Sequence, residues 1–316
     1  MWHRLCLTPA PPRLSLSGGA GLPGRPLPWW RRLRRRFWHA VARGALAAAG
    51  GLPPRVGRAA GRALGRWALR CRAAERKRAR VNISRAFPDL PAGAREVLLK
   101  ESAAALGANL YDALALARHA PRNLAAVTDD GAGAAARALL KEGRGLLVLT
   151  GHLGCWELLG AWLARELGGL AVVTGTVHNA PVDRLLNEQR IQLGLQPLPR
   201  GGDLRPMLRH LRAGGAVAVL LDQNTHVHNL DVPFFGRPAP TPVGFARLAL
   251  RLKAPILPVA IRRRGEGHHV RHLPALRPVG AEKSQTVYDL LSACNAALER
   301  LIREAPAEWI WFHERW

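Results

Sequence analysis

A histidine and a glutamate, His152 and Glu157, lie five positions apart directly after the apolar run 145–150, which is typical of a buried strand. Five residues of a regular helix turn through about 500°, so both side chains cannot share one helical face. We therefore expect His152 in the turn after the strand and Glu157 in the first turn of the next helix. There the carboxylate would accept a hydrogen bond from one ring nitrogen, leaving the other to take a proton from a substrate hydroxyl.

The spacing alone is a weak signal. With 12 histidines and 22 acidic residues in 316 positions, chance gives about one such pair, and the chain has three, at His152, His178 and His226. Only the first follows a strand-like run and a glycine and precedes an apolar helical pattern, at 156–163. A core histidine satisfied by a nearby acid explains the same residues, so both interpretations stay open here.

From about residue 142 the chain alternates strand-like and helix-like segments. This predicts an α/β fold with a mostly parallel central sheet flanked by helices. Ligands of such sheets bind beyond the carboxyl ends of the strands. The strands are expected at 145–150, 170–176, 216–221 and 255–261, and the helices at 156–168, 181–194, 203–213 and 242–252.

Asp222 and Gln223 follow the strand expected at 216–221. If that strand is a near neighbour of the one before His152, Asp222 and His152 face one cleft. The alternative is an aspartate that only caps a turn.

Further along, Phe234 and Phe235 form an aromatic pair that could line an apolar pocket for a hydrocarbon chain, although paired aromatics more often belong to the core. Thr241 followed by Pro242 predicts the N-cap and first residue of a helix. Cys155 raises a second mechanism, in which a thiolate activated by His152 would attack the substrate and form a covalent intermediate.

Composition bounds the remaining possibilities. A chain of 316 residues with 48% hydrophobic residues can bury a sizeable core and is not generally disordered. Its four cysteines are widely scattered, with no CxxC pair and no histidine cluster at metal-ligand spacing. We therefore expect no disulfide framework and no metal site, in a reducing environment that faces the cytosol. We also expect no bound cofactor, because there is no Walker A loop and the GxGxxG match at 19–24 has no strand before it.

Positive charge is concentrated in the N-terminal third. Residues 1–100 hold 22 Lys and Arg against 3 Asp and Glu, whereas residues 101–316 hold 25 against 19. A basic arm before a nearly balanced body is typical of docking on an acidic partner, either nucleic acid or an anionic membrane surface. No nucleic-acid reading module is recognisable, which favours the membrane.

A basic amphipathic helix is the clearest part of this arm. Arginines recur every fourth residue on one side and apolar residues follow the other, at Arg58, Arg62, Arg66 and Arg70 and at Ala60, Leu64, Trp67 and Cys71. Each basic residue near anionic lipid contributes ~1 kcal/mol. The alternative is a helix that packs its apolar face on the protein's own core.

The sequence divides into three parts. Residues 1–28 are rich in Pro, Gly and Leu and are predicted to be a disordered extension. We expect residues 29–72 to form a basic membrane-associating helical segment and residues 73–316 to form the α/β domain. The apolar run at 40–52 is short and interrupted, so the pattern leaves open whether the segment spans the membrane or lies on it.

Several short motifs, in this order and spacing, resemble the bacterial lipid A biosynthesis acyltransferases, the lauroyl and myristoyl transferases of the wider lysophospholipid and glycerolipid acyltransferase superfamily. The resemblance runs from about residue 37 to the C-terminus. The motifs are Asn82 to Pro88, His152-x4-Glu157, Asn179 to Arg190, Asp222-Gln223, Pro233 to Gly236 and Trp309 to Trp316.

The resemblance implies an O-acyltransferase at the cytoplasmic face of a bacterial inner membrane. It would move a fatty acyl chain from an acyl-carrier-protein or coenzyme A thioester to a hydroxyl of a glycolipid, with a lipid A precursor favoured. His152 and Glu157 would be the catalytic dyad, with His152 as general base and Glu157 orienting it. Arg190 and Asp222 match further polar positions, and Arg190 would lie near the thioester carbonyl or a substrate phosphate, unless it is an ordinary surface charge.

Other functions remain open from the sequence. The acceptor could be another lysolipid or a phosphatidylinositol mannoside. A thioester hydrolase with the same cleft would release free fatty acid without an acceptor. A non-enzymatic basic adaptor would bind polyanions with strong salt dependence and would not need His152.

Overall fold

The computed structural model describes residues 29–175, 179–201, 203–225, 227–280 and 284–316. The extension predicted at 1–28 lies outside these residues, as do His178 and His226.

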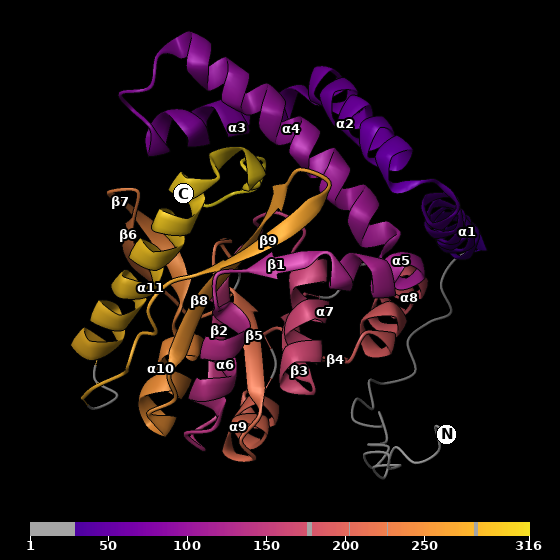
Figure 1. Cartoon of the computed structure of the whole chain (residues 1–316). Helices are drawn as coiled ribbons and strands as arrows, with labels where there is room; N and C mark the ends of the chain where they lie inside the picture. Colours follow the sequence, from indigo (N-terminus) through magenta and orange to yellow (C-terminus); the bar gives the residue numbers. More distant parts are fainter. Residues whose placement is uncertain (1–28, 176–178, 202, 226, 281–283) are drawn as a thin grey trace, which may run out of the picture.

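A seven-stranded sheet forms the centre of the chain, with strand order β1-β9-β8-β2-β5-β3-β4 (Figure 1). Neighbouring strands run parallel, except that β8 and β9 are antiparallel. The predicted α/β fold with a mostly parallel sheet is confirmed. The strands are β1 (Val127–Asp129), β2 (Leu146–Thr150), β3 (Leu170–Thr174), β4 (Leu195–Pro199), β5 (Ala216–Leu220), β8 (Ile256–Arg264) and β9 (Gly267–His272), and a separate hairpin consists of β6 (Asn229–Phe234) and β7 (Arg237–Pro242).

Helices cover both faces of the sheet. Side chains of β2 alternate between two cores, so that Leu146 and Val148 pack with α5, α6 and α7 while Leu147 and Leu149 pack with α9, α10 and α11. All five residues of β2 are buried, as expected for a central parallel strand. The helices are α1 (Trp29–Gly51), α2 (Pro54–Cys71), α3 (Ala73–Ala86), α4 (Ala92–Leu114), α5 (Leu116–Ala125), α6 (Ala132–Leu140), α7 (Trp156–Leu167), α8 (Ala180–Gln192), α9 (Arg205–Arg212), α10 (Val243–Leu252) and α11 (Ser284–Glu304), followed by a 3₁₀ turn, η1 (Pro306–Glu308).

The four predicted strands and four predicted helices all exist, with ends shifted by up to three residues. The helix start predicted at Thr241 and Pro242 was wrong. Helix α10 begins at Val243 with Pro242 at the cap position and no side-chain cap. Thr241 belongs to β7, where its hydroxyl accepts hydrogen bonds from Arg315 and Asn295 and is therefore not available as a cap.

Helix α2 lies beside α4 (Figure 1), and glycines of both helices allow their backbones to approach closely. A Cβ atom at Gly107 would lie 1.9 Å from the carbonyl oxygen of Gly61, and one at Gly65 would lie 2.0 Å from that of Ala103. The glycine face of α2 thus lies against the protein, and its apolar face does not. Leu64 and Trp67 are 55% and 59% exposed, which contradicts the alternative that this face packs on the protein's own core.

One arginine of α2 departs from the predicted polar stripe. Arg58 is buried, and its Nε donates to Asp112 on α4 at 2.8 Å while Nη1 donates to the carbonyl of Glu266 at 2.7 Å. Glu266 lies in the turn between β8 and β9. Because β8 runs parallel to β2, this turn lies at the edge of the sheet where the parallel strands end. Helix α2 is therefore fixed to that edge.

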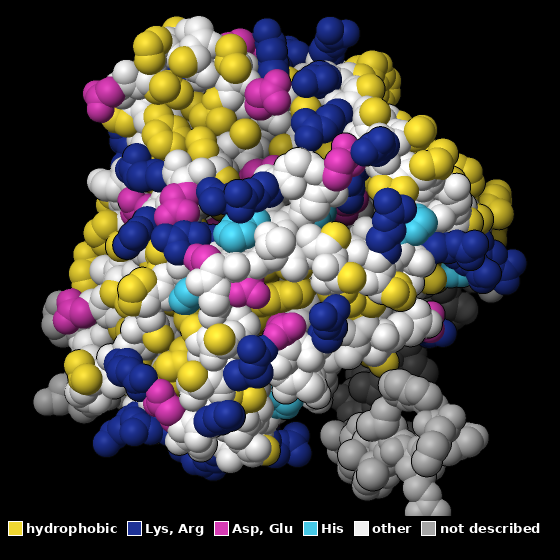
Figure 2. All heavy atoms as spheres, in the orientation of Figure 1, with side chains coloured by type: hydrophobic (Ala, Val, Ile, Leu, Met, Phe, Trp, Pro, Cys, Tyr) yellow, Lys and Arg dark blue, Asp and Glu magenta, His cyan; other side chains and the backbone are white. Residues whose placement is uncertain are grey.

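Large apolar side chains are exposed along α1 as well, at Trp29, Trp30, Leu33, Phe37 and Trp38. Figure 2 shows hydrophobic and Lys or Arg side chains intermixed over the surface of α1 and α2. Within the part of the chain that the structure describes, no helix is both long and apolar enough to cross a membrane.

The close packing of α2 on α4 makes a sharp stability prediction. Gly107→Ala should lower the free energy of unfolding by about 1–3 kcal/mol, because the new methyl group would push the two backbones apart. At Gly93, in the same helix, a new Cβ would have no atom within 4 Å. Gly93→Ala should therefore raise the free energy of unfolding by about 0.5–1 kcal/mol. Chemical denaturation measures both, and equal effects would contradict this packing.

Candidate functional site

His152 and Asp222 meet at the carboxyl edge of the sheet. Strands β2 and β5 are direct neighbours, paired in register from Leu146↔Ala216 to Thr150↔Leu220. Each side chain follows its strand by two residues, and Nδ1 of His152 lies 2.8 Å from Oδ1 of Asp222. The two residues meet as expected, but Asp222 is fully buried and only His152 lines the cavity at this edge.

Two glycines let the His152 turn approach its neighbours. A Cβ atom on Gly151 would lie 2.8 Å from Oδ2 of Asp222, so a larger residue would push the carboxylate away. Gly154 has φ +63°, and a Cβ there would lie 1.9 Å from the carbonyl oxygen of Ile261. The turn leads into α7, and Glu157 lies in its first turn as predicted.

The Asp222 carboxylate is fully buried and accepts three hydrogen bonds. Oδ1 accepts from His152 Nδ1, and Oδ2 accepts from the backbone N–H of His152 at 2.6 Å and from Nε1 of Trp309 at 2.7 Å. Burial alone would raise the pKa of this carboxyl group. Attraction to His152 and the hydrogen bonds from His152 and Trp309 outweigh burial and hold the pKa well below its usual range.

This arrangement fixes the proton on the imidazole. An ionised carboxylate can only accept, so Nδ1 of His152 must carry a proton, and in the neutral ring Nε2 keeps its lone pair. No partner of Nε2 is found among the described residues, and the ring lines a cavity. His152 can therefore act as a general base toward a group in that cavity.

We predicted that Glu157 would accept a hydrogen bond from the His152 ring, but the structure shows a different partner. Glu157 forms a two-pronged ion pair with Arg190 of α8, with Nη2 2.6 Å from Oε1 and Nε 3.1 Å from Oε2. The sequence interpretation was wrong because Nδ1 is already bound by Asp222, which follows a strand distant in sequence. Asp222 takes the orienting position that we had expected for Glu157.

Arg190 is not an ordinary surface charge, because it is partly buried and lines the same cavity as His152. Burial alone would lower its pKa, but the hydrogen bond and negative charge of Glu157 raise it. The guanidinium therefore stays charged, and its Nη1 also donates to the side chain of Asn187 at 3.2 Å. The pair presents an anchored cation whose charge is largely balanced by Glu157.

The cavity has a volume of about 650 Å³, within the range of small-molecule sites. It opens where β3 and β5 separate, because these strands pair only at Ala171↔Val217 and Val172↔Ala218. His152, Glu157, Arg190 and Gln223 supply polar groups. Much of the remaining wall is apolar and includes Leu159, Leu163, Val172, Leu195, Leu204, Met207, Val219, Phe245 and Leu248.

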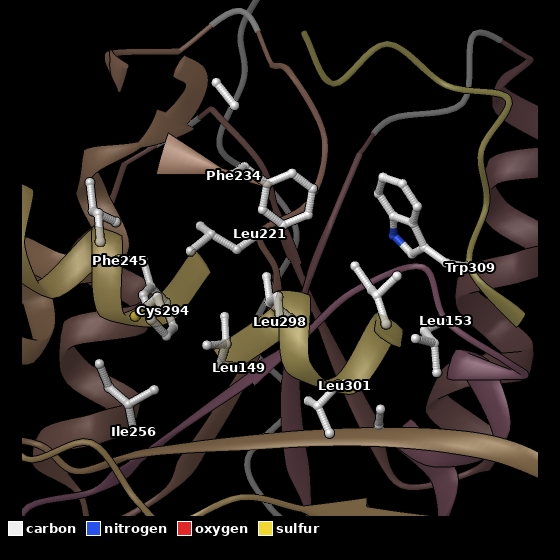
Figure 3. Close-up of a cluster of buried hydrophobic side chains, with 14 of the residues drawn as sticks. Leu149, Leu153, Leu221, Phe234, Phe245, Ile256, Cys294, Leu298, Leu301 and Trp309 are labelled. Carbon is white, nitrogen blue, oxygen red and sulfur yellow. The ribbon is translucent and has the colours of Figure 1, made fainter. Parts of the chain in front are cut away.

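Phe234 and Phe235 lie elsewhere. Both are buried, and neither lines the cavity. Phe234 packs in the core beside Leu221 and Trp309, as Figure 3 shows. These side chains support the C-terminal segment and do not line a pocket for a hydrocarbon chain, which corrects the prediction.

The alternative of a cysteine nucleophile is not supported by its surroundings. Cys155 is buried, and its Sγ lies 3.8 Å from the carbonyl oxygen of Asn109. Burial raises the pKa of the Cys155 thiol far above its usual range, so the reactive thiolate is disfavoured.

Two C-terminal residues that sequence reasoning did not assign to the site also contact Asp222. Trp309 donates to its carboxylate, and Nε2 of His313 donates to its backbone carbonyl at 2.9 Å. The aromatic C-terminal motif was the only signal, and nothing in its spacing connects residue 309 with residue 222.

The sequence model of the family described as bacterial lipid A biosynthesis acyltransferase matches residues 29–316. Among curated proteins, a phosphatidylinositol mannoside acyltransferase of Mycobacterium tuberculosis (strain ATCC 25618 / H37Rv) is 27% identical over 186 residues, covering 57% of each chain. A protein of the same name from Mycolicibacterium smegmatis is 26% identical over 184 residues, covering 56% of this chain and 58% of the relative. The chain thus spans slightly more than half the length of these relatives.

The hydrogen bonds to Asp222 make a pH-dependent prediction. The pKa of this carboxyl is depressed in the folded protein, so the ionised group adds to the free energy of unfolding. This contribution is fully present at pH values above the usual aspartate pKa of about 3.9, and it is lost as the pH falls below that value. The stability advantage of the wild type over Asp222→Asn should therefore shrink as the pH falls below about 4. Denaturation between pH 3 and pH 7 measures this difference.

Asp231→Asn, at an exposed position of β6, is the control and should follow the wild-type profile. A wild-type advantage over Asp222→Asn that stays constant down to pH 3 would contradict the interpretation.

Proposed function

The chain belongs to the bacterial lipid A biosynthesis acyltransferase family, and we propose on this basis that it transfers a fatty acyl chain from a thioester to a hydroxyl of a glycolipid. The observation that carries the proposal is the His152 and Asp222 pair beside a largely apolar cavity. A base of this kind suits a hydroxyl acceptor, and an apolar cavity suits a hydrocarbon chain.

The proposed reaction uses Nε2 of His152, for which the described residues provide no partner. A hydroxyl is too weakly acidic to attack a thioester unaided, so Nε2 removes its proton while the oxygen bonds to the carbonyl carbon. The carbon–sulfur bond then breaks, and the imidazolium returns the proton to the leaving thiolate. Asp222 holds the ring and stabilises the imidazolium between these steps.

The donor is proposed to be an acyl-carrier-protein or coenzyme A thioester, with its acyl chain along the apolar wall of the cavity. Arg190, held by Glu157, places positive charge beside the thioester carbonyl or a substrate phosphate. Gln223 adds a neutral polar group to the same cavity.

Two acceptors compete within this proposal. Membership of the family favours a lipid A precursor. The names of the curated relatives favour phosphatidylinositol mannoside as the second candidate. Both offer sugar hydroxyls beside lipid chains, so the chemistry at His152 is the same.

The exposed apolar and arginine side chains of α1 and α2 support docking on an anionic membrane surface, proposed as the cytoplasmic face of a bacterial inner membrane. Arg58 attaches α2 to the edge of the sheet that also carries His152. Docking through α2 would therefore bring the site close to lipid acceptors.

Purified protein incubated with labelled acyl thioester tests the reaction class. Labelled glycolipid that forms only when lipid A precursor or phosphatidylinositol mannoside is added supports transfer and identifies the acceptor. Equal release of free fatty acid with and without acceptors would indicate a hydrolase. Salt-sensitive polyanion binding without turnover would indicate an adaptor.

His152→Ala should lower kcat for acyl transfer by about 10²–10⁴-fold, because it removes the general base. Cys155→Ser should retain most of the activity, since its thiol is buried and disfavoured as a thiolate. Undiminished turnover by His152→Ala, or an acyl group trapped on Cys155, would contradict the mechanism.

The double variant Leu64→Glu and Trp67→Glu should bind anionic phospholipid vesicles much more weakly, because both side chains are exposed on α2 and carboxylates are repelled by the surface. Val279→Glu, at an exposed apolar position in the loop before α11, is the control and should bind like the wild type. Vesicle flotation measures binding, and equal binding by both variants would rule out α2 as the docking face.

A further inference from the structure

The indole of Trp309 is placed to control the carboxylate that holds His152. Its Nε1 lies 2.7 Å from Oδ2 of Asp222, and both side chains are buried. Oδ2 has one other donor, the backbone N–H of His152, while Oδ1 is used by the ring. The indole is therefore the one donor to this carboxylate that does not come from His152 among the described residues.

We propose that Trp309 is a positioning residue of the acyl-transfer site, whose indole N–H holds the Asp222 carboxylate in the plane that lets Oδ1 orient His152. This inference rests on the proposed function, and it adds a role for the C-terminal segment. A carboxylate can rotate about its last bond, and two donors on Oδ2 oppose that rotation. Without the indole N–H, one of the two would be lost.

The backbone around Trp309 fixes the indole relative to the His152 turn. Residues 308–310 run antiparallel to this turn, with a bridge between Leu153 and Trp309. Gly154 N–H donates to the carbonyl of Glu308 at 2.9 Å, and Ile310 N–H donates to that of His152 at 3.1 Å. The donor and the histidine that it serves are thus parts of one hydrogen-bonded unit.

His313 holds the other end of Asp222. Its Nε2 donates to the Asp222 carbonyl, and burial lowers the pKa of His313, so the ring is neutral near pH 7. The charge of Asp222 opposes this lowering of the pKa, whereas the positive charges of His152 and Arg315 add to it. The C-terminal segment therefore restrains both the backbone and the side chain of Asp222 without adding a second positive ring.

Trp311 provides a matched control two residues away. It is equally buried, and its ring centroid lies 4.5 Å from that of Trp309. Its Nε1 donates to the carbonyl of Pro306 at 2.8 Å and not to Asp222. Replacing either tryptophan by phenylalanine removes an indole N–H from the same segment and the same core, but only one replacement changes the donors to Asp222.

The test compares Trp309→Phe with Trp311→Phe in steady-state acyl transfer. Trp309→Phe should lower kcat about 10- to 100-fold, the effect of losing one hydrogen bond to a charged group, with KM for the acyl thioester unchanged. Trp311→Phe should keep kcat within about twofold of the wild type. Equal losses in the two variants, or a loss confined to KM, would overturn the proposal.

A spectroscopic readout separates this inference from the proposed function. In protein with ¹⁵N-labelled histidine, the Nδ1–H resonance of His152 should move in Trp309→Phe and stay in place in Trp311→Phe. This result holds even if the wild type transfers no acyl group, in which case the proposed function fails alone. An unmoved resonance in a folded Trp309→Phe variant would overturn the positioning role.

If Trp309→Phe does not fold, Asp222→Asn tests the same hydrogen bond by changing its acceptor in place of its donor. The indole N–H resonance of Trp309 should then shift while that of Trp311 does not. Failure of the Trp309 resonance to move would show that the indole does not hold Asp222 in solution.

Discussion

The hydrogen bonding of one buried carboxylate is the constraint on which the site depends. Asp222 has no contact with solvent, so its charge is tolerated only where N–H groups replace the lost water. Those donors come from the turn after β2 and from the C-terminal segment, near residues 152 and 309. Strand adjacency, the glycine at 151 and the C-terminal pairing are all needed to bring them together.

The same constraint explains why the two acidic residues of the site bind different basic groups. Because Asp222 occupies Nδ1 of His152, Glu157 is left to pair with Arg190. One carboxylate therefore holds the proposed base, and the other holds a cation beside the cavity. In the proposed mechanism Asp222 would stabilise the imidazolium of His152, while the charge of Arg190 is balanced by Glu157.

The sequence predicted the helices and strands better than the contacts between them. Apolar runs such as 145–150 identified central strands, because buried parallel strands are continuously hydrophobic. The short β1 and the proline-rich β7 carry no such pattern and were not predicted. Strand order is a tertiary property, so the neighbourhood of residues 152 and 222 could be stated only conditionally. The role expected for Glu157 was wrong because closeness along the chain was taken for closeness in space.

In helix α2 the periodicity of the sequence was interpreted correctly, but it did not show which face packs on the protein. The pattern of α2 separated arginines from apolar residues, but glycines at 57, 61 and 65 form a third face, and this one packs on α4. Arg58 lies beside that face and meets Asp112, which Arg263 of β8 also binds at 2.6 Å. Burial alone would raise the pKa of Asp112, but His268, the charge of Arg263 and the hydrogen bonds from both arginines keep it well below the usual range. A permanently charged, buried cluster thus fixes α2 to the edge of the sheet that carries the site, so a membrane contact made by its exposed face would be held in a defined orientation relative to His152.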